Sequence, residues 1–572
     1  MSKRYMYKNR ICLIILLLCC SISIISCAKR KSKADEIFSY YQQAKEAFFE
    51  QSDFEKADTL LKNVLKLNPK FKADYFNFML GYIYESKHLY NEAIAHYSKE
   101  LETNKRKEVK DKEIYQFSLL YLARTYFEAG LLYKKFFNLA VNSQINYYNT
   151  KLLLRKEVIT TQSLKLKPEN INHLLYFRGL CYYLRGDLNE AVSDLRKVDI
   201  KSTLYLKALI KLGACYYKLG KIKEAEQTWK EVYSYSKDPI ILNELGYTYA
   251  ELGIKERFNQ TQEWANQVPL EKGRKSLCLI HFKNNKIDKA LELLKEIQLE
   301  IPDLVEERGA YISRDSNRKV KYITNFYNPA MLNHKADIYF TMAIKYYKNY
   351  LELAKNKDLI YHQIGLSQFH SNQLKDAILT FSQLINDATD TKIKAMSQIN
   401  LGTCYYLDDR KEKAFSIWDN LYRNSVRDHE MLSQIGVTYA RLKIRLEDAL
   451  SLCEIPEARI PGELSWNLGI VYFQKGLNES KIEYFSESIG YLEKNHTQKG
   501  GYTLEIDDPS LLLDLASAYY NRRLFRTATS IIFSFRQYYP EVDQIFNPFQ
   551  VVSELKGMEG INWKINWKEI GL

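Results

Sequence analysis

The motifs of common catalytic and metal sites are absent from this sequence of 572 residues. There is no GxGxxG, no phosphate-binding loop, no GxSxG and no HExxH. The nine histidines are scattered, and His362 and His370 have poor ligand spacing on a helix, with no carboxylate or cysteine to complete a set. Asp507 and Asp508 are paired acids, but they are expected to cap a helix that begins near Ser510. The sequence therefore predicts no enzyme activity, no metal, no cofactor and no small-molecule substrate.

Cysteine is scarce as well, with nine residues and no CxxC pair. Four cysteines fall within the first 27 residues, which leaves an odd number in the rest of the chain: Cys181, Cys215, Cys278, Cys404 and Cys453. Three of these occupy one place of a repeated phrase and are expected to be small buried apolar residues. Cysteines one repeat apart are expected to be too distant for a disulfide, which needs Cα atoms within about 7 Å.

Nucleic-acid motifs are also missing, although the formal net charge is +14. Lysine and arginine are interleaved with aspartate and glutamate along the whole chain and form no dedicated patch. The charge is therefore interpreted as a bias of composition, and no nucleic-acid partner is predicted.

The N-terminus, by contrast, carries a targeting pattern. A basic segment is followed by the apolar run ICLIILLLCCSISII, which is too short for a comfortable membrane span. The run ends in Ile24-Ile25-Ser26-Cys27, which resembles the lipobox of bacterial lipoproteins. The resemblance implies a signal peptide over residues 1–26 and lipid attachment at Cys27. A plain signal peptide or an uncleaved anchor are the alternatives. Residues 27–35 would form a basic tether suited to anionic headgroups, or a merely solvated one.

One phrase recurs through the rest of the chain. GLCYYLRGDLNEA begins at Gly179, GACYYKLGKIKEA at Gly213 and GTCYYLDDRKEKA at Gly402. Relative to the opening glycine, an aromatic residue stands at position +3, alanine at +12 and a bulky residue at +16. The +12 alanines are Ala93, Ala191, Ala225, Ala290, Ala377, Ala414 and Ala528. The +16 residues are Tyr97, Leu195, Trp229, Leu294, Phe381, Trp418 and Ile532.

This spacing predicts a helical hairpin. Apolar residues at −4, −1, 0 and +3 form the stripe of a first helix. Turns are expected near Gly186, Gly220, Gly253 and Gly476. Glycine on the first helix and alanine on the second would allow a close helix crossing, with the bulky residue filling the space beyond. One such hairpin cannot bury its apolar faces alone, whereas stacked copies can.

A period of about 34 residues with this pattern resembles the tetratricopeptide repeat family. The resemblance implies an all-α, right-handed solenoid of about a dozen hairpins. The expected arrangement is an N-terminal array over 36–298, an inserted linker over 299–335, a C-terminal array over 336–540, and a capping helix and tail over 541–572. Within this period, 131–168 is expected to form an over-long second helix.

In that family the first helices line a concave groove that holds peptide partners. The inward +4 position of this chain is aromatic in most copies, and we select Tyr183, Tyr217, Phe282, Phe369, Tyr406, Phe473 and Tyr520 as partner-binding candidates. Two hypotheses remain open. Either the aromatics line an open groove for a protein segment, or the superhelix winds tightly enough to fill its own lumen.

The function predicted from these features is a lipid-anchored scaffold of a bacterial envelope. Its partner would be a protein or peptide segment, and its membrane contact the N-terminal lipid, at the outer membrane. A role in envelope or outer-membrane assembly is expected. A surface-exposed adhesion or structural lipoprotein, or a regulator of a cell-wall enzyme, are the alternatives.

Overall fold

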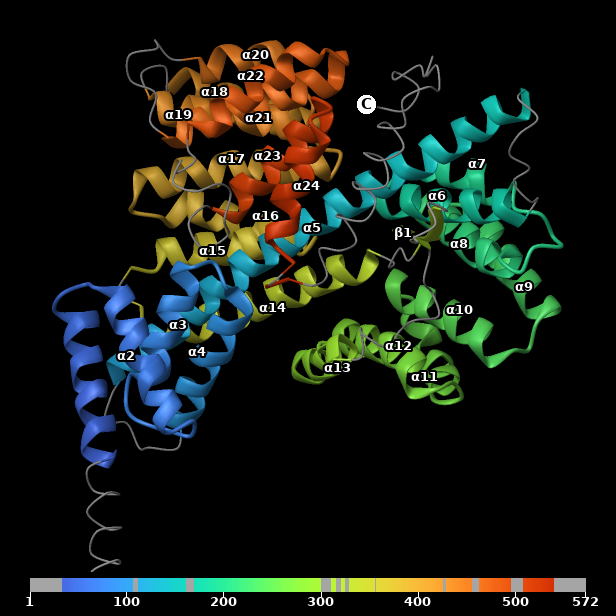
Figure 1. Cartoon of the computed structure of the whole chain (residues 1–572). Coiled ribbons are helices and arrows are strands. Elements are labelled where there is room, and N and C mark those ends of the chain that lie inside the picture. The colour runs from blue at the N-terminus through green and yellow to red at the C-terminus, as the bar shows by residue number, and fades with distance from the viewer. Residues whose placement is uncertain are drawn as a thin grey trace, which may run out of the picture. The chain divides into compact units, whose positions relative to one another are not determined.

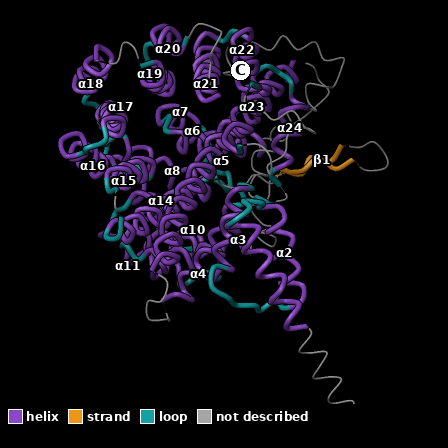
Figure 2. The backbone as a smooth tube through the Cα atoms, turned by 90° about the vertical axis from the view of Figure 1, so that its left-hand side faces the viewer, coloured by secondary structure: helices purple, strands orange, loops and turns teal. Residues whose placement is uncertain are grey.

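The structure is a computed structural model, and helices make up nearly all of its described part (Figures 1 and 2). The described residues are 33–105, 112–160, 169–299, 310–314, 320–324, 329–354, 356–424, 428–454, 462–494, 508–536 and 538–539. Cys27, the signal peptide, most of the tether and the expected capping helix over 541–572 lie outside these ranges. The all-α hairpin fold is confirmed, with one short pair of strands added to it.

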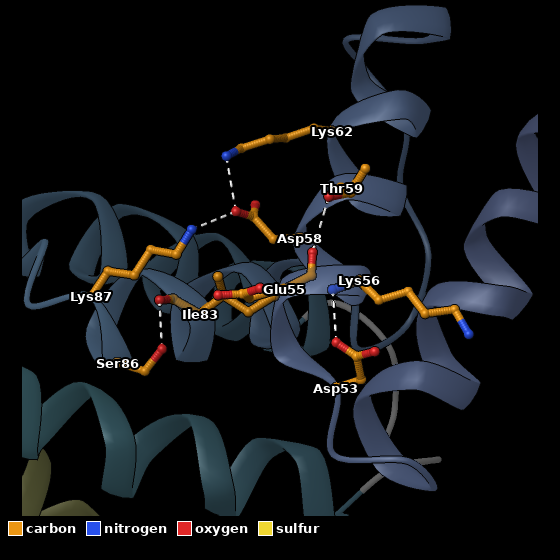
Figure 3. Close-up of polar contacts among 9 residues, drawn as sticks. All are labelled: Asp53, Glu55, Lys56, Asp58, Thr59, Lys62, Ile83, Ser86 and Lys87. Carbon is orange, nitrogen blue, oxygen red and sulfur yellow. Dashed lines mark hydrogen bonds and ion pairs between the residues drawn. The ribbon is translucent and has the colours of Figure 1, made fainter. Parts of the chain in front are cut away.

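The chain divides into two compact units, Met1–Thr125 and Tyr126–Leu572. In the first unit, a helix over residues 33–49 precedes α2 (Phe54–Leu67), α3 (Phe76–Ser86) and α4 (Tyr90–Lys105), and α5 (Lys112–Thr160) begins there. Figure 3 shows how α2 is tied to the end of α3. The buried Asp58 carboxylate accepts from Lys62 at 2.9 Å and from Lys87 at 2.6 Å.

The second unit contains the remainder of α5 and two runs of hairpins. The first run consists of α6 (Glu169–Arg185), α7 (Leu188–Leu195), α8 (Tyr205–Lys218), α9 (Ile222–Tyr235), α10 (Pro239–Leu252), the 3-10 turn Lys255–Arg257, α11 (Phe258–Asn266), α12 (Leu270–Lys283) and α13 (Ile287–Leu299). The second run consists of α14 (Ala330–Leu351), α15 (Asp358–His370), α16 (Leu374–Asp387), α17 (Thr391–Leu407), α18 (Lys411–Asn424), α19 (His429–Arg441), α20 (Leu446–Cys453), α21 (Gly462–Glu479), α22 (Ile482–Glu493), α23 (Pro509–Asn521) and α24 (Phe525–Ser534).

Local sequence sets where these helices begin and end. Asp508 accepts from the backbone N–H groups of Ser510 and Leu511, so the predicted cap of α23 is confirmed. Three of the four predicted turn glycines adopt the left-handed backbone conformation: Gly186, Gly220 and Gly253. The fourth prediction is wrong. Gly476 lies inside α21, where a Cβ atom would come within 2.9 Å of the Phe485 ring, and the turn falls instead at Ser480.

Stacking follows the expected order. Several second helices pack on the next first helix, as α7 does on α8 and α16 on α17, and first helices also contact one another, as α8 and α10 do. All seven +12 alanines are completely buried, which matches their expected place at the helix crossing. The cores therefore run from hairpin to hairpin, in the manner of a repeat array.

The prediction of an over-long second helix over 131–168 is wrong about where the helix begins. Helix α5 has 49 residues and runs without a turn from Lys112, so it fuses a first-helix stretch with the expected second helix. Gly130, the residue that could have ended the first helix, is used for packing, because a Cβ atom there would lie 2.8 Å from the ring of Phe340 on α14.

The stretch expected to link the two arrays contains secondary structure of its own. Strand β1 (Ala310–Arg314) pairs antiparallel with β2 (Val320–Thr324), and Ile312 lies opposite Tyr322. Helix α14 then begins at Ala330, earlier than the expected boundary, because Pro329 holds the chain in a helical conformation before it.

Candidate partner-binding surface

The hairpin contact explains why glycine opens each phrase. A Cβ atom on Gly213 would lie 2.4 Å from Nε1 of Trp229, and a Cβ atom on Gly402 would lie at the same distance from Nε1 of Trp418. The Trp229 indole N–H donates to the carbonyl oxygen of Ile210 at 3.1 Å, and Trp418 repeats this bond at 3.2 Å. The bulky +16 residue therefore lies directly on the glycine, rather than in the space beyond the helix crossing as the sequence suggested.

Two of the seven candidate aromatics are buried. Tyr183 is 0% exposed and Tyr520 is 3% exposed. The expectation that these side chains project partly exposed from the first helices does not hold at these two positions. Burial raises the pKa of both phenols. For Tyr520, hydrogen bonding to the Asn146 side chain on α5 opposes this increase in pKa.

The other five candidates are half-buried: Tyr217, Phe282, Phe369, Tyr406 and Phe473. Three of them rest on a ring of the second helix of their own hairpin. The ring centroids of Tyr217 and Trp229 are 6.0 Å apart, those of Tyr406 and Trp418 6.2 Å, and those of Phe473 and Phe485 5.8 Å. These tilted and edge-on ring contacts hold each ring while leaving part of it accessible. A partner-binding role for the seven side chains stays a prediction.

A buried polar cluster surrounds Tyr183. Lys211 on α8 donates to Glu251 on α10 at 2.8 Å, and its ammonium lies 5.2 Å from the centre of the Tyr183 ring. Burial alone would raise the pKa of Glu251, but the neighbouring lysines and His334 outweigh it and lower that pKa to about 2. Glu251 therefore stays ionised as the counter-ion of Lys211, which makes this end of the first-helix surface a closed polar core.

The middle of α5 packs against several helices of the C-terminal run. Its Phe127 ring lies 5.8 Å from Phe340 on α14 and 6.0 Å from His370 on α15. Further along α5, Phe136 lies 5.5 Å from Phe535, which comes directly after α24. These contacts favour the self-filled alternative only where α5 lies, at α14, α15 and the end of α24, and they do not include Tyr406 on α17.

A polar clasp fixes the same helix. The ammonium of Lys135 donates to the carboxylate of Asp514 at 3.0 Å and to the carbonyl oxygen of Ser510 at 3.1 Å, both on α23. It also lies 5.3 Å from the centre of the Trp466 ring on α21, and the indole N–H of Trp466 donates to Asp514 at 2.9 Å. One lysine of α5 thus joins two first helices.

A second feature, which sequence reasoning missed, is a set of hydrogen bonds between neighbouring first helices. Positions are counted from the opening glycine of each repeat, or from Cys278 where a cysteine takes its place. In three cases the residue at position −2 bonds to the residue at position −3 of the preceding repeat. They are Ser276 to Asn243 at 2.9 Å, Asn400 to His362 at 3.1 Å and Asn467 to Ser433 at 3.0 Å. The side chains of Asn400 and Asn467 are therefore engaged within the array.

The described residues carry no other obvious binding chemistry. Within the described ranges no group of three or more His, Cys, Asp or Glu side chains could hold a metal ion. The five cysteines outside the N-terminal segment are free and buried, which confirms the burial expected for the three in the repeated phrase. In this described part, no helix combines the length and apolar character needed to cross a membrane.

Comparison with known proteins gives one sequence match. A family model described as anaphase-promoting complex, cyclosome, subunit 3 matches residues 144–232. No curated protein matches the sequence.

Solved structures match over most of the chain, at low similarity. The crystal structure of the yeast Tom70 shares 12% identity, covers 92% of this chain and 97% of its own, and has a TM-score of 0.29. The crystal structure of the APC/C hetero-tetramer Cut9-Hcn1 shares 13% identity, covers 89% of this chain and 96% of its own, and has a TM-score of 0.24. Neither TM-score supports a shared global arrangement.

The family match runs from the last part of α5 into α9, and it includes α6 to α8, where the repeated phrase is most regular and where glycine and the +16 residue are in contact. Over these residues the chain is similar to the matched family, and its helical hairpins have the arrangement expected from the resemblance to tetratricopeptide repeats.

Proposed function

We propose that this chain is a lipid-anchored scaffold of a bacterial envelope, which holds a protein or peptide segment against the first helices of its repeats. Tetratricopeptide hairpins suit this role because their stacked helices offer an extended surface to a protein partner. A part in envelope or outer-membrane assembly would follow from the anchor at the outer membrane.

The observation that carries the proposal is the set of five half-buried first-helix aromatics. Aromatic residues often contribute most of the energy of a protein interface. Tyr217, Tyr406 and Phe473 are already held by rings of their second helices, so a partner would order few additional side chains on binding. Tyr183 and Tyr520 are buried and would act only by supporting the surface.

Site-specific photo-crosslinking tests this assignment. A photoreactive amino acid is placed at position 217 or 406, and for comparison at 235 or 422, which belong to the second helices of the same hairpins. Tyr235 and Tyr422 are exposed, so the probe is accessible there as well. Adducts of one mass from 217 and 406, and not from 235 and 422, are the expected result. Adducts from all four positions, or from the comparison positions alone, contradict the proposal.

Support for the anchor comes from the N-terminal sequence. We expect Cys27→Ala to stop the incorporation of labelled palmitate and to release the protein from membranes, because that thiol is the proposed site of acylation. Labelled palmitate in this variant would refute the assignment. A single acyl chain binds membranes weakly, so the basic residues after Cys27 are expected to strengthen the anchor.

The alternative functions differ in where the chain is exposed. A surface adhesion or structural lipoprotein would be degraded when intact cells are treated with protease. An internal scaffold would survive that treatment and be degraded only after the outer membrane is permeabilised. A regulator of a cell-wall enzyme would also survive, but its photo-crosslinked adduct would contain that enzyme.

A further inference from the structure

We propose that the segment from α14 to α17 is an acid-sensitive junction, where a proton on His362 or His334 opens the packing between first helices. The proposal is independent of the partner and of the lipid anchor. It starts from two buried imidazoles, each of which bonds to the first helix of another repeat.

His362 on α15 is 2% exposed and is bonded to α17. Its Nε2 atom lies 3.1 Å from the Nδ2 atom of Asn400. An amide nitrogen can only donate, so the imidazole must be neutral and accept at Nε2. Protonation would place an N–H group against the amide N–H, and the bond would be lost.

The surroundings of His362 offer no compensation for a charge. The Phe381 ring on α16 lies 5.8 Å away, and Asn400 is the polar partner on α17. Burial is the cause that lowers the pKa of His362 to about 4, and no charged side chain contributes to it. A protonated His362 is therefore accommodated only when α15 and α17 separate enough to admit water.

His334 on α14 is 8% exposed and faces α10. Its Nε2 atom lies 3.1 Å from the hydroxyl oxygen of Tyr247. The hydroxyl can turn and accept from a protonated ring, so the cost here comes from burying a charge. Burial lowers the pKa of His334 to about 4, and Glu251 opposes that change.

Charged groups reach His334 from every side of the junction. Lys134 approaches from α5, Lys211 from α8 and Lys283 from α12, and all three disfavour a further positive charge. Glu251 on α10 favours it but already pairs with Lys211. A proton on His334 therefore adds charge to a cluster in which cations are in excess.

Asp337, one turn further along α14, has the opposite effect on the opening of the junction by acid. Burial raises its pKa to about 6, although Lys134 and Lys283 oppose this. It takes up a proton in the folded state before it would in the unfolded state, so its contribution favours the closed state as the pH falls through about 6. Each histidine shift changes the opening equilibrium about 20-fold between pH 7 and pH 5, and two histidines together outweigh the roughly 10-fold opposite effect of one such carboxyl group.

Hydrogen exchange of the full chain at pH 7 and pH 5, corrected for the intrinsic rate, tests the proposal. In the wild-type protein, amide exchange in α14 to α17 should rise at least about tenfold more than in α8, α9 and α21 to α24. An equal rise across the second unit, or no rise in α14 to α17, would overturn the proposal without any variant.

The variants His334→Gln and His362→Gln, alone and combined, identify the groups, and all are made in a His370→Gln background because burial also lowers the pKa of His370 on α15, to about 3. Glutamine can keep a side-chain hydrogen bond but does not titrate in this range. The double variant should lose the additional exchange at pH 5 and keep the wild-type pattern at pH 7. His429→Gln is the matched control, because His429 is exposed at the start of α19. An acid response that persists in the double variant, or disappears in the control, would overturn the assignment.

Discussion

At the scale of single residues, glycine is retained where a bulky side chain lies on the first helix. Gly402→Ala would place a Cβ atom 2.4 Å from Nε1 of Trp418, so the indole must move and its hydrogen bond to Ile399 must stretch. We expect a loss of about 1–3 kcal/mol in the free energy of unfolding, typical of overpacking.

Gly490 supplies the matched control for this substitution. It lies inside α22, and a Cβ atom there would meet nothing within 4 Å. Gly490→Ala should therefore stabilise the protein by up to about 1 kcal/mol, because alanine has the higher helix propensity. Denaturant unfolding of both variants gives the comparison, and equal effects of the two substitutions would contradict the proposed role of the repeat glycine.

A second residue-scale prediction concerns Asp58 in the first unit. Burial alone would raise the pKa of its carboxyl group, but the hydrogen bonds from Lys87 and Lys62 outweigh burial and lower it. A lowered folded-state pKa contributes stability above the unfolded value of 3.8, and this stability is lost as the pH falls through the folded-state value.

Asp58→Asn should remove that contribution. The variant should unfold at lower denaturant than the wild type at pH 7, and the difference between them should shrink toward pH 3. Lys56→Gln is a suitable control, since Lys56 lies on the same helix and its side chain donates to the exposed Gln51 rather than to Asp58. A difference between wild type and Asp58→Asn that does not change with pH would contradict this role of the carboxylate.

At the scale of elements, the part of α5 in the second unit supports the C-terminal run of hairpins. Phe136 is completely buried on α5, whereas Phe117 on the same helix is exposed. Phe136→Ala should cost about 3–5 kcal/mol through lost burial and a cavity. Phe117→Ala should change stability by no more than about 0.5 kcal/mol.

The location of the damage distinguishes a supporting role of α5 from a simple loss of helix. Hydrogen exchange in Phe136→Ala should rise first in α23 and α24, which contact α5 through Phe535 and Lys135, and later in α8 and α9. An early rise in α8 and α9 would show that α5 does not support the last hairpin.

The hairpins can be predicted well from the sequence because their signals are local. Glycine, alanine and the +16 residue recur within one repeat, and three of the four predicted turn glycines do form turns. Gly130 and Gly476 are misleading, since each is used for packing against Phe340 or Phe485 rather than for a turn. Only the folded contacts decide between those two uses of glycine.

The candidate surface could be predicted only in part for a related reason. The +4 spacing places the aromatics on the first helices, but their exposure depends on segments distant in sequence. Tyr520 is buried beside α5, and Tyr183 is buried beside Lys211. The bonds between first helices, such as Asn400 to His362, also join different repeats and leave no trace in any single phrase.

At the scale of the whole molecule, acid should weaken the fold in two ranges. His96, His334 and His362 have pKa values lowered to about 4, mainly by burial, so stability should fall as the pH drops from 6.5 toward 4. Glu251, with a pKa lowered to about 2, should remove further stability between pH 4.5 and pH 2. Melting temperatures measured from pH 7 to pH 2 check both ranges, and a maximum of stability near pH 4.5 would contradict the assignment.

Partner binding at the half-buried aromatics of the first helices is best tested by one paired comparison. One double variant carries Tyr217→Ser and Tyr406→Ser. The comparison variant carries Tyr235→Ser and Tyr422→Ser, which alter the second helices of the same two hairpins. Capture of the photo-crosslinked partner is measured with the melting temperature of each protein. We expect capture by the first variant to fall at least about tenfold, with only a modest change in melting temperature, while the second variant resembles the wild type. Capture that survives in the first variant, or falls equally in both, would contradict binding at these aromatics.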